Sequence, residues 1–489
     1  MISSAHFFNP PAMRFTAVSA ALVFAAGSAP VSAEDAPITN LQECIEAGEF
    51  DVTKDYFPEK FVPDETTDYL EIEYHNSYKI VRNKFQEKSY LLYQCGSEPP
   101  ADEVEGGEHH IILSVPHTGG VAVTETPQIP PPELLGRRKE IIAYIGNPKY
   151  VSSPCLDTMM DETKEVDVFF NPDDPFNSTW TASATADFVT DNPEAIIFGG
   201  PFGDKDSARV MSIAASQERT NVATFDWIGV YAALFNLEGM ATRIVSDTKA
   251  RYECSAANAA AMTADLQEEN KPTLLWANFF TGIGWSVAEC PSWDAAYNCE
   301  IAQHCGADLL ERPEGVGFSQ SYGGPRLYWY LTDEEFLELG KDAKYWIYPS
   351  KTFEAVFEEK KDMLSQFRSV KEGRVFDTLG QGEHSWHEQR LAEYDVVALD
   401  FCDIVGTSDP MPPFHKRRWF RNVYEEAVGY LSACDGPDEM NQPYVPAEAQ
   451  CTLIGASPST EAFSSGTTIV KSMASFLILF LGTAIILVL

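Results

Sequence analysis

The sequence predicts an α/β protein of two lobes, each with a mostly parallel sheet covered by helices, joined by one long linker helix. Between Gly239 and Pro272, residues 240–271 contain neither glycine nor proline, which favours an unbroken helix of roughly 45 Å. On both sides of this stretch, strand-like and helix-like segments alternate, as they do in parallel sheets whose ligand face lies at the carboxyl ends of the strands. A pair of shorter helices broken near Asn258 is the alternative.

The first half of the chain contains several short segments that are apolar throughout or alternate apolar with polar residues, as strands do. The predicted strands are residues 69–74, 89–93, 111–115, 141–145, 195–198 and 222–225, with a helix over residues 206–217.

The second half repeats this alternation more clearly. Thr332 and Glu335 form a capping box that predicts a helix start, and Gly340 predicts its end. The other predicted elements are strands at residues 273–280, 345–348, 373–376 and 396–399, a helix ending at residues 301–305, and a helix over residues 353–364.

The charge balance excludes one class of partner. The 489 residues include 35 basic and 73 acidic side chains, for a formal net charge of -38. Such a surface repels phosphate backbones, so nucleic acid is not an expected partner.

Both ends of the chain resemble targeting signals. The apolar run at residues 15–26 and the small residues before Glu34 predict a signal peptide over residues 1–33. The hydrophobic end, residues 467–489, resembles a glycosylphosphatidylinositol (GPI) anchor signal, with an ordinary membrane span as the alternative. These features predict the secretory pathway and the extracellular face of the plasma membrane.

These observations divide the chain into seven regions. The divisions are a signal peptide (1–33), an extended lead-in (34–64), an N-terminal α/β lobe (65–238), a linker helix (239–271), a C-terminal α/β lobe (272–433), an extended tail (434–466) and the anchor signal (467–489).

The ten cysteines favour disulfides in a secreted chain. Spacing does not determine their connectivity, although a local pair such as Cys434 with Cys451 is one candidate. The single sequon, at Asn177, predicts a glycosylated surface loop.

Three segments of the second half carry a family resemblance. They are residues 370–376 (VKEGRVF), 386–391 (WHEQRL) and 395–400 (DVVALD). Together with residues 123–136 and 192–197, they resemble class III solute-binding proteins, the helical-linker type that serves siderophore, haem and cobalamin importers. The likeness spans roughly residues 75–430 and implies a non-enzymatic protein that captures a ligand, with an iron-siderophore favoured, in the cleft between two lobes. It also implies delivery of that ligand to a membrane transporter or a reductase.

The resemblance places ligand contacts on loops that match Trp180, Phe280, Tyr328 and the segment from Trp386 to Arg390. Two further aromatic residues beside glycine-rich turns, Trp285 and Tyr322, are candidates for the same cleft. Aromatic faces supply contact area and arginine orients a carboxylate or hydroxamate, so Arg390, and with less support Arg137 and Arg138, are the candidate polar contacts. No cofactor or resident metal is predicted. Packing in the core is the alternative for each aromatic residue.

Two other site hypotheses stay open. His117, His384 and His387 are imaginable as an imidazole cluster for a bare metal ion. Residues 114–120 (SVPHTGG) also resemble the histidine motif of N-formylglutamate amidohydrolase-like metal hydrolases, with acids from Asp157, Asp161 and Glu162. The second hypothesis makes the chain a metal-dependent enzyme.

Overall fold

The structure is a computed structural model that describes residues 39–173, 178–203, 207, 209–290, 296–321, 328–408 and 414–454, without the side chains of residues 178–181, 268 and 296. The described residues from Asn40 onward form one compact unit. The predicted signal peptide, sequon and hydrophobic end lie outside the described residues, as do Tyr322 and the side chain of Trp180.

The first sheet has four strands in chain order. They are β1 (Leu70–Tyr74), β2 (Tyr78–Asn83), β3 (Lys88–Gln94) and β4 (Ile111–Val115). The first three pair antiparallel, whereas β4 runs parallel to β3.

The second sheet is wholly parallel and has the order β7-β6-β5-β8-β9. Its strands are β5 (Val121–Val123), β6 (Ile141–Ile145), β7 (Asp167–Phe169), β8 (Ile196–Gly199) and β9 (Val210–Ser212). After β5 the chain adds β6 and β7 on one side, then returns to add β8 and β9 on the other. The direction of winding therefore reverses between β5 and β8.

The third sheet belongs to the second half of the chain and follows the order β11-β10-β15-β16-β17, with β12 also on β10. Its strands are β10 (Thr273–Phe280), β11 (Gly284–Val287), β12 (Asp308–Leu309), β15 (Tyr345–Ile347), β16 (Val375–Asp377) and β17 (Arg421–Asn422). The pairs β10–β12, β10–β15 and β15–β16 are parallel. A separate hairpin joins β13 (Phe318–Gln320) and β14 (Tyr328–Tyr330).

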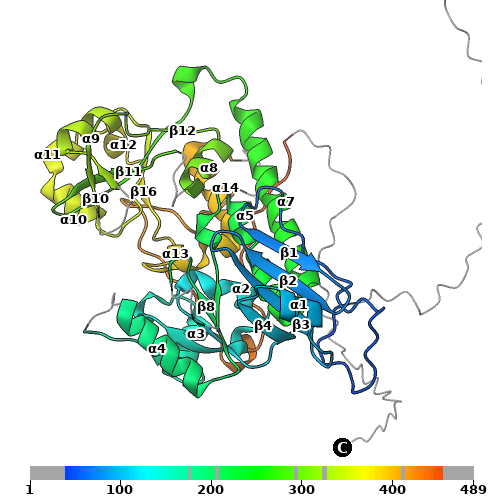
Figure 1. Cartoon of the computed structure of the whole chain (residues 1–489). Coiled ribbons are helices and arrows are strands. Elements are labelled where there is room, and N and C mark those ends of the chain that lie inside the picture. The colour runs from blue at the N-terminus through cyan, green and yellow to red at the C-terminus, as the bar shows by residue number, and fades with distance from the viewer. Residues whose placement is uncertain are drawn as a thin grey trace, which may run out of the picture. The chain divides into compact units, whose positions relative to one another are not determined.

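Helices fill the connections, and α9 to α12 gather around the third sheet (Figure 1). In the first half they are α1 (Ala101–Gly106), α2 (Pro130–Leu134), α3 (Pro154–Asp161), α4 (Ser178–Asp191), α5 (Asn221–Phe225) and α6 (Ile228–Phe235). In the second half they are α8 (Ala296–His304), α9 (Asp333–Gly340), α10 (Phe353–Glu359), α11 (Lys361–Leu364), α12 (Arg368–Lys371), α13 (Ser385–Gln389), α14 (Tyr394–Val405) and α15 (Pro437–Met440). Six short 3₁₀ turns in the described residues are Thr126–Gln128, Arg138–Glu140, Pro148–Tyr150, Ala215–Gln217, Glu268–Asn270 and Arg390–Glu393. The prediction of an α/β protein with mostly parallel sheets is confirmed.

The long helix α7 (Glu238–Thr263) has 26 residues and continues through Asn258 without a break. It ends earlier than the predicted position 271, since the backbone turns after Thr263. Helix α7 packs along α14 and also contacts α5, α6 and α8 (Figure 1). Its side chains join two hydrophobic clusters, one built mainly on the first two sheets and one on the third.

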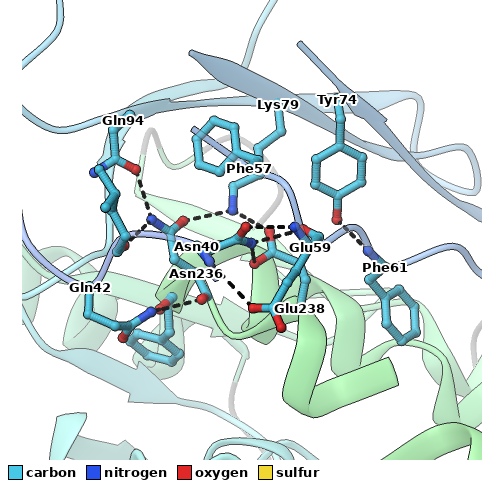
Figure 2. A network of polar contacts seen from close by, with 12 residues as sticks. Asn40, Gln42, Phe57, Glu59, Phe61, Tyr74, Lys79, Gln94, Asn236 and Glu238 are labelled. Carbon is cyan, nitrogen blue, oxygen red and sulfur yellow. Dashed lines mark hydrogen bonds and ion pairs between the residues drawn. The ribbon is translucent and has the colours of Figure 1, made fainter. Parts of the chain in front are cut away.

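A buried polar network fastens the start of α7 to the first sheet (Figure 2). Lys79 on β2 forms an ion pair with Glu238, and both side chains are 0% exposed. The Lys79 ammonium also donates to Asn236 Oδ1 at 2.8 Å, and Asn40 Nδ2 donates to Glu238 Oε2 at 2.7 Å. Asn236 occupies the left-handed region at the end of α6, which asparagine tolerates better than most residues. The lead-in, the first sheet and α7 are thus joined by one set of hydrogen bonds.

All ten cysteines form disulfides, and the candidate pair Cys434–Cys451 is wrong. The five bridges are Cys44–Cys95, Cys155–Cys434, Cys254–Cys451, Cys290–Cys299 and Cys305–Cys402. Residues 434–454, hereafter the tail segment, are therefore attached to α3 at one end and to α7 near the other. The predicted pair was based on the short spacing between the two cysteines. It was wrong because this segment runs extended and its two cysteines reach different helices.

Three predicted elements are wrong in type. The predicted helix over residues 206–217 contains β9 and a 3₁₀ turn, and the predicted strand at residues 222–225 lies in α5, whose first turn the Thr220 side chain caps at Ala223 N. The predicted strand at residues 396–399 lies within α14, which is buried on nearly every side. A continuous apolar run is shared by buried strands and buried helices, so periodicity does not separate the two.

Candidate ligand-binding site

The direction of winding reverses between β5 and β8 at the carboxyl edge of the second sheet. In open α/β sheets, ligands bind where neighbouring parallel strands send their connections in opposite directions. Thr124 follows β5 directly and stays against β8, because its amide donates to the Phe198 carbonyl at 3.2 Å. The residues after β5 therefore occupy the position at which the fold favours a ligand.

Gly200, just after β8, allows Glu125 to reach this edge. A Cβ atom at position 200 would lie 1.8 Å from Glu125 Oε1, so any larger residue would displace the carboxylate. The glycine thus sets where the Glu125 side chain lies.

A cavity of about 110 Å³ lies beside these residues. Its lining comes from the loop after β5, from the residues between β9 and α6, and from residues 387–392. The polar and aromatic residues among its walls are Glu125, Gln128, Ser216, Thr224, Phe225, Trp227, Tyr231, His387, Glu388 and Arg390. Both halves of the chain contribute, so the cavity exists only in the assembled tertiary structure.

Two buried residues from the first half present polar atoms that have no partner among the described residues. The Gln128 side-chain oxygen accepts from the amides of Thr124 and Glu125 at 2.9 and 3.2 Å, which leaves its Nε2 group unpaired. Tyr231, 1% exposed, packs its ring 4.3 Å from that of Phe198 and leaves its hydroxyl unpaired. Buried polar groups are normally hydrogen-bonded, so each unpaired atom indicates a missing partner.

Arg390 supplies the cation of the cavity. Its guanidinium carbon lies 4.4 Å from the centre of the Tyr297 ring, and Nη1 donates to the Trp386 carbonyl at 3.2 Å. Its Nε atom is buried and unpaired, and no carboxylate of the described residues forms an ion pair with this arginine. Arg390 keeps part of its surface exposed, and desolvation of the rest lowers its pKa.

Desolvation shifts the pKa values of the other titratable residues that line the cavity. Burial raises the pKa of Glu388 to about 8, although each of its oxygens accepts an amide proton, from Ser152 and Ser153 at 2.7 and 2.6 Å. Burial, followed by the nearby charge of Arg390, lowers the pKa of His387 to about 4. Desolvation also raises the pKa of Glu125. Both Glu125 and His387 are nevertheless exposed at the surface.

Of the seven predicted contact residues, Arg390 lines this cavity. Trp386 lies behind it, 2% exposed, with its ring centre 5.6 Å from the guanidinium. Trp285 is fully buried and stacks on Phe336 with 3.9 Å between ring centres. Phe280 and Tyr328 are exposed, at 42% and 37%, and are not among the cavity walls. Trp180 belongs to α4 by its backbone, and Tyr322 is outside the described residues.

Arg137 and Arg138 have other partners. Arg138, 3% exposed, forms an ion pair with the buried Glu133 at 2.5 Å and donates to carbonyls of the tail segment. Arg137 donates to Gln42 Oε1 at 2.6 Å. Both arginines therefore hold the fold together.

The two metal-dependent hypotheses gain no support in the described part of the chain. His117 is 6% exposed and its Nε2 lies 3.0 Å from the Gly120 carbonyl, so it shapes the loop before β5. His384 packs against the Tyr150 ring. Where the structure describes the chain, the one group of three candidate ligand atoms involves Cys155, Cys434 and Glu439, and the two cysteines are bonded to each other.

Sequence reasoning missed Gln128, Trp227 and Tyr231. Gln128 had a usable signal, because it follows a buried strand closely in an α/β pattern. Tyr231 and Trp227 lie in or beside a wholly apolar stretch, residues 228–235, where nothing distinguishes a cavity wall from core.

Comparisons with known proteins complete the description of the site. No protein-family model matches the chain. A protein described as an uncharacterized lipoprotein, from Methanocaldococcus jannaschii, is 22% identical over 343 residues, which cover 67% of this chain and 74% of that protein.

The solved structures to which the chain is similar include periplasmic binding proteins. A periplasmic haem-binding protein from Pseudomonas aeruginosa has a TM-score of 0.40 at 12% identity, covering 60% of this chain and 95% of that one. A periplasmic vitamin B12-binding protein from Vibrio cholerae has a TM-score of 0.38 at 9% identity, covering 60% and 98%. No helix within the described residues has the length and apolarity needed to cross a membrane.

Proposed function

We propose that this protein is a solute-binding protein that captures a small-molecule ligand, part of which enters the cavity beside Arg390. One observation carries the proposal: Arg390, Gln128 and Tyr231 line one cavity, and each has a buried polar atom with no partner among the described residues. Such atoms destabilise a protein by about 1–3 kcal/mol each unless something pairs with them. The cavity also lies beside the switch point of a parallel sheet, where open α/β sheets bind ligands.

The arrangement favours capture over catalysis. Both oxygens of Glu388, the most buried acid of the cavity, are occupied by backbone amides, so this residue supports the walls. Two lobes facing each other across the cavity, with α7 as the linker, would explain why residues from both halves line it. Because α7 is continuous, we expect any closing motion to be small.

An iron-siderophore is the ligand class we propose, with haem and cobalamin as rivals. The resemblance of residues 370–376, 386–391 and 395–400 to class III solute-binding proteins motivates this choice. The two similar structures named above are described as a periplasmic haem-binding protein and a periplasmic vitamin B12-binding protein. A membrane transporter or a reductase would receive the ligand.

Tryptophan fluorescence offers a direct test, because Trp227 lines the cavity and Trp386 lies behind Arg390. Mature protein is titrated with ferric hydroxamate siderophore, haem and cobalamin, and saturable quenching at micromolar concentration is expected for one of them. Trp227→Phe should remove part of the quenching, whereas Trp329→Phe, a residue stacked on Arg312 away from the cavity walls, should leave it unchanged. A signal that never saturates with any ligand would argue against solute capture.

Location is a second part of the proposal. The chain would be secreted by the leader at residues 1–33 and held at the extracellular surface by a GPI-type anchor or a membrane span encoded in residues 467–489. Five disulfides agree with passage through an oxidising compartment. Release from intact cells by phosphatidylinositol-specific phospholipase C would support the lipid anchor, and retention would favour the span. A glycan at Asn177 would be detected as a mass loss with an Asn177→Gln variant.

A further inference from the structure

The walls of the cavity contain a cation that nothing described in the structure neutralises. Moving an isolated charge out of water is costly, and buried guanidinium groups are normally paired with an anion. Arg390 instead rests on the Tyr297 ring and donates to a neutral carbonyl. Other arginines stacked on aromatic rings in this protein do have acidic partners: Arg374, over Tyr345, lies 3.0 Å from Glu372. The missing anion is therefore a property of this site.

The unpaired atoms also share one polarity. Arginine Nε is always a donor, and the side-chain amide of Gln128 must present its NH₂ group because its oxygen already accepts two backbone amides. The Tyr231 hydroxyl can donate as well. A partner that satisfies all three atoms together offers several acceptor oxygens.

The acidic walls do not cancel this preference. Each oxygen of Glu388 is taken by a backbone amide, and burial raises the pKa of this residue to about 8, so it is mostly neutral at pH 7. His387 is neutral at that pH, since burial lowers its pKa to about 4. Desolvation also raises the pKa of Glu125, which lies against Gly200 and forms no ion pair with Arg390. Arg390 is the one arginine among the described residues that line the recess.

Size restricts the ligand further. Sites for drug-sized molecules enclose about 300–1,000 Å³. The 110 Å³ of this cavity holds a small group only.

Resting on the proposed solute-binding function, we propose that the recess binds a small, oxygen-rich anionic group, a carboxylate or an inorganic oxyanion, whose oxygens accept from Arg390, Gln128 and Tyr231. The group is either a free small anion or the exposed anionic end of a larger chelate. An intact tetrapyrrole does not fit inside the recess, and any ligand of that size would have to leave most of its surface outside it.

Isothermal titration calorimetry at constant ionic strength tests this assignment on the mature full chain. The probes are acetate, citrate, inorganic phosphate and sulfate as free anions, ferric citrate as an anionic chelate, and glycerol and tetramethylammonium as neutral and cationic comparisons. We expect saturable binding of at least one anionic probe and none of the comparisons. Tighter binding of ferric citrate than of citrate would identify a chelate, and the reverse would identify a free anion.

Variants connect binding to the residues. Arg390→Gln should weaken the anion by at least tenfold, and Tyr231→Phe, which removes one hydroxyl, should weaken it about three- to tenfold. Arg390→Lys keeps the charge and should retain more affinity than Arg390→Gln. The matched control Arg374→Gln also removes a guanidinium from an aromatic ring, and its affinity should stay within twofold of the parent. Near-ultraviolet circular dichroism checks that each variant is folded.

The possible outcomes distinguish a failure of the anion assignment from a failure of the proposed solute-binding function. If a siderophore, haem or cobalamin binds with an affinity that folded Arg390→Gln and Tyr231→Phe leave unchanged, the anion assignment is overturned and solute capture stands. If glycerol or tetramethylammonium binds as well as the anions, the assignment is also overturned. If none of these compounds binds, solute capture itself fails.

Discussion

The buried ion pair between Lys79 and Glu238 allows one prediction to be worked out in detail. Both side chains are 0% exposed, and the pair joins β2 to the first residue of α7 (Figure 2). Replacing Lys79 with Met removes the ammonium but keeps a long unbranched side chain beside Phe57. In the parent protein, Lys79 Nζ lies 4.4 Å from the centre of the Phe57 ring. The change therefore acts mainly on the charge.

The magnitude follows from what remains around the carboxylate. Breaking a buried pair by removing one partner costs about 3–5 kcal/mol, because the other charge is left buried and uncompensated. Glu238 keeps one partner, since Asn40 Nδ2 donates to Oε2 at 2.7 Å, while Oε1 loses its bond to Lys79. We expect a loss near the lower end, about 3 kcal/mol. Adding Glu238→Gln removes the stranded charge, so the double variant should be more stable than Lys79→Met alone.

Urea unfolding at pH 7, followed by circular dichroism with the disulfides intact, measures this loss. The matched control is Lys84→Met, whose surface pair with Glu71 is 2.9 Å long and about half exposed, with side-chain exposures of 48% and 44%. Exposed pairs contribute about 0–1 kcal/mol, so the control should change little. Equal effects of the two lysine variants would refute the reasoning.

Four further predictions concern stability. Trp285→Ala should cost about 3–5 kcal/mol of unfolding free energy, because it removes a fully buried ring that stacks on Phe336. Phe280→Ala, which removes an exposed ring, should cost much less. Comparable losses for the two variants in urea unfolding would contradict the assignment of Trp285 to the core. Removing Cys254–Cys451 by double alanine substitution should lower stability by up to about 5 kcal/mol, and removing Cys290–Cys299 by up to about 3 kcal/mol. The first bridge closes the longer loop, with a sequence separation of 197 against 9 residues, and so restricts the unfolded chain more. The reverse order in thermal melts would argue against an unfolded-state effect. Burial raises the pKa of Glu388 from 4.5 to about 8, so the folded state retains a proton that the unfolded state releases, and stability should fall as pH rises from 4.5 to 8; Glu388→Gln should flatten that decline, and an unchanged slope would contradict it. Burial lowers the pKa of His304 from 6.5 to about 4, so the unfolded state binds the extra proton and stability should fall as pH drops from 6.5 to 4; a His304→Gln variant with the parent's acid sensitivity would count against this.

Sequence and structure agree best where a local signal is sufficient. The strands at Ile111–Val115, Ile141–Ile145 and Thr273–Phe280 have the predicted boundaries, and the Thr332 capping box starts α9 as expected. A helix cap or a short apolar run between turn residues depends on neighbours in the chain, so the sequence alone predicts the local structure there. Disagreement arose at α5 and α14, whose apolar segments could be placed in a strand or in a buried helix until the surrounding core was known.

The candidate site shows the same division. Arg390 was identified in advance through its family-like segment, but its importance comes from Tyr297 beneath it and from the absence of an acidic partner in the described residues. Trp285 was a candidate because it follows a glycine-rich turn, but the structure places it against Phe336 in the core.

The sequence by itself determined the α/β class, the long helix before residue 264, the acidic surface and the even set of cysteines, since each depends on composition or on nearest neighbours. Only the tertiary structure decided the disulfide connectivity, the reversal of the second sheet at β5 and β8, and the meeting of Gln128, Tyr231 and Arg390 around one cavity. These features join residues separated by up to hundreds of positions. Such contacts form only when the whole core packs, and local propensity carries no information about them.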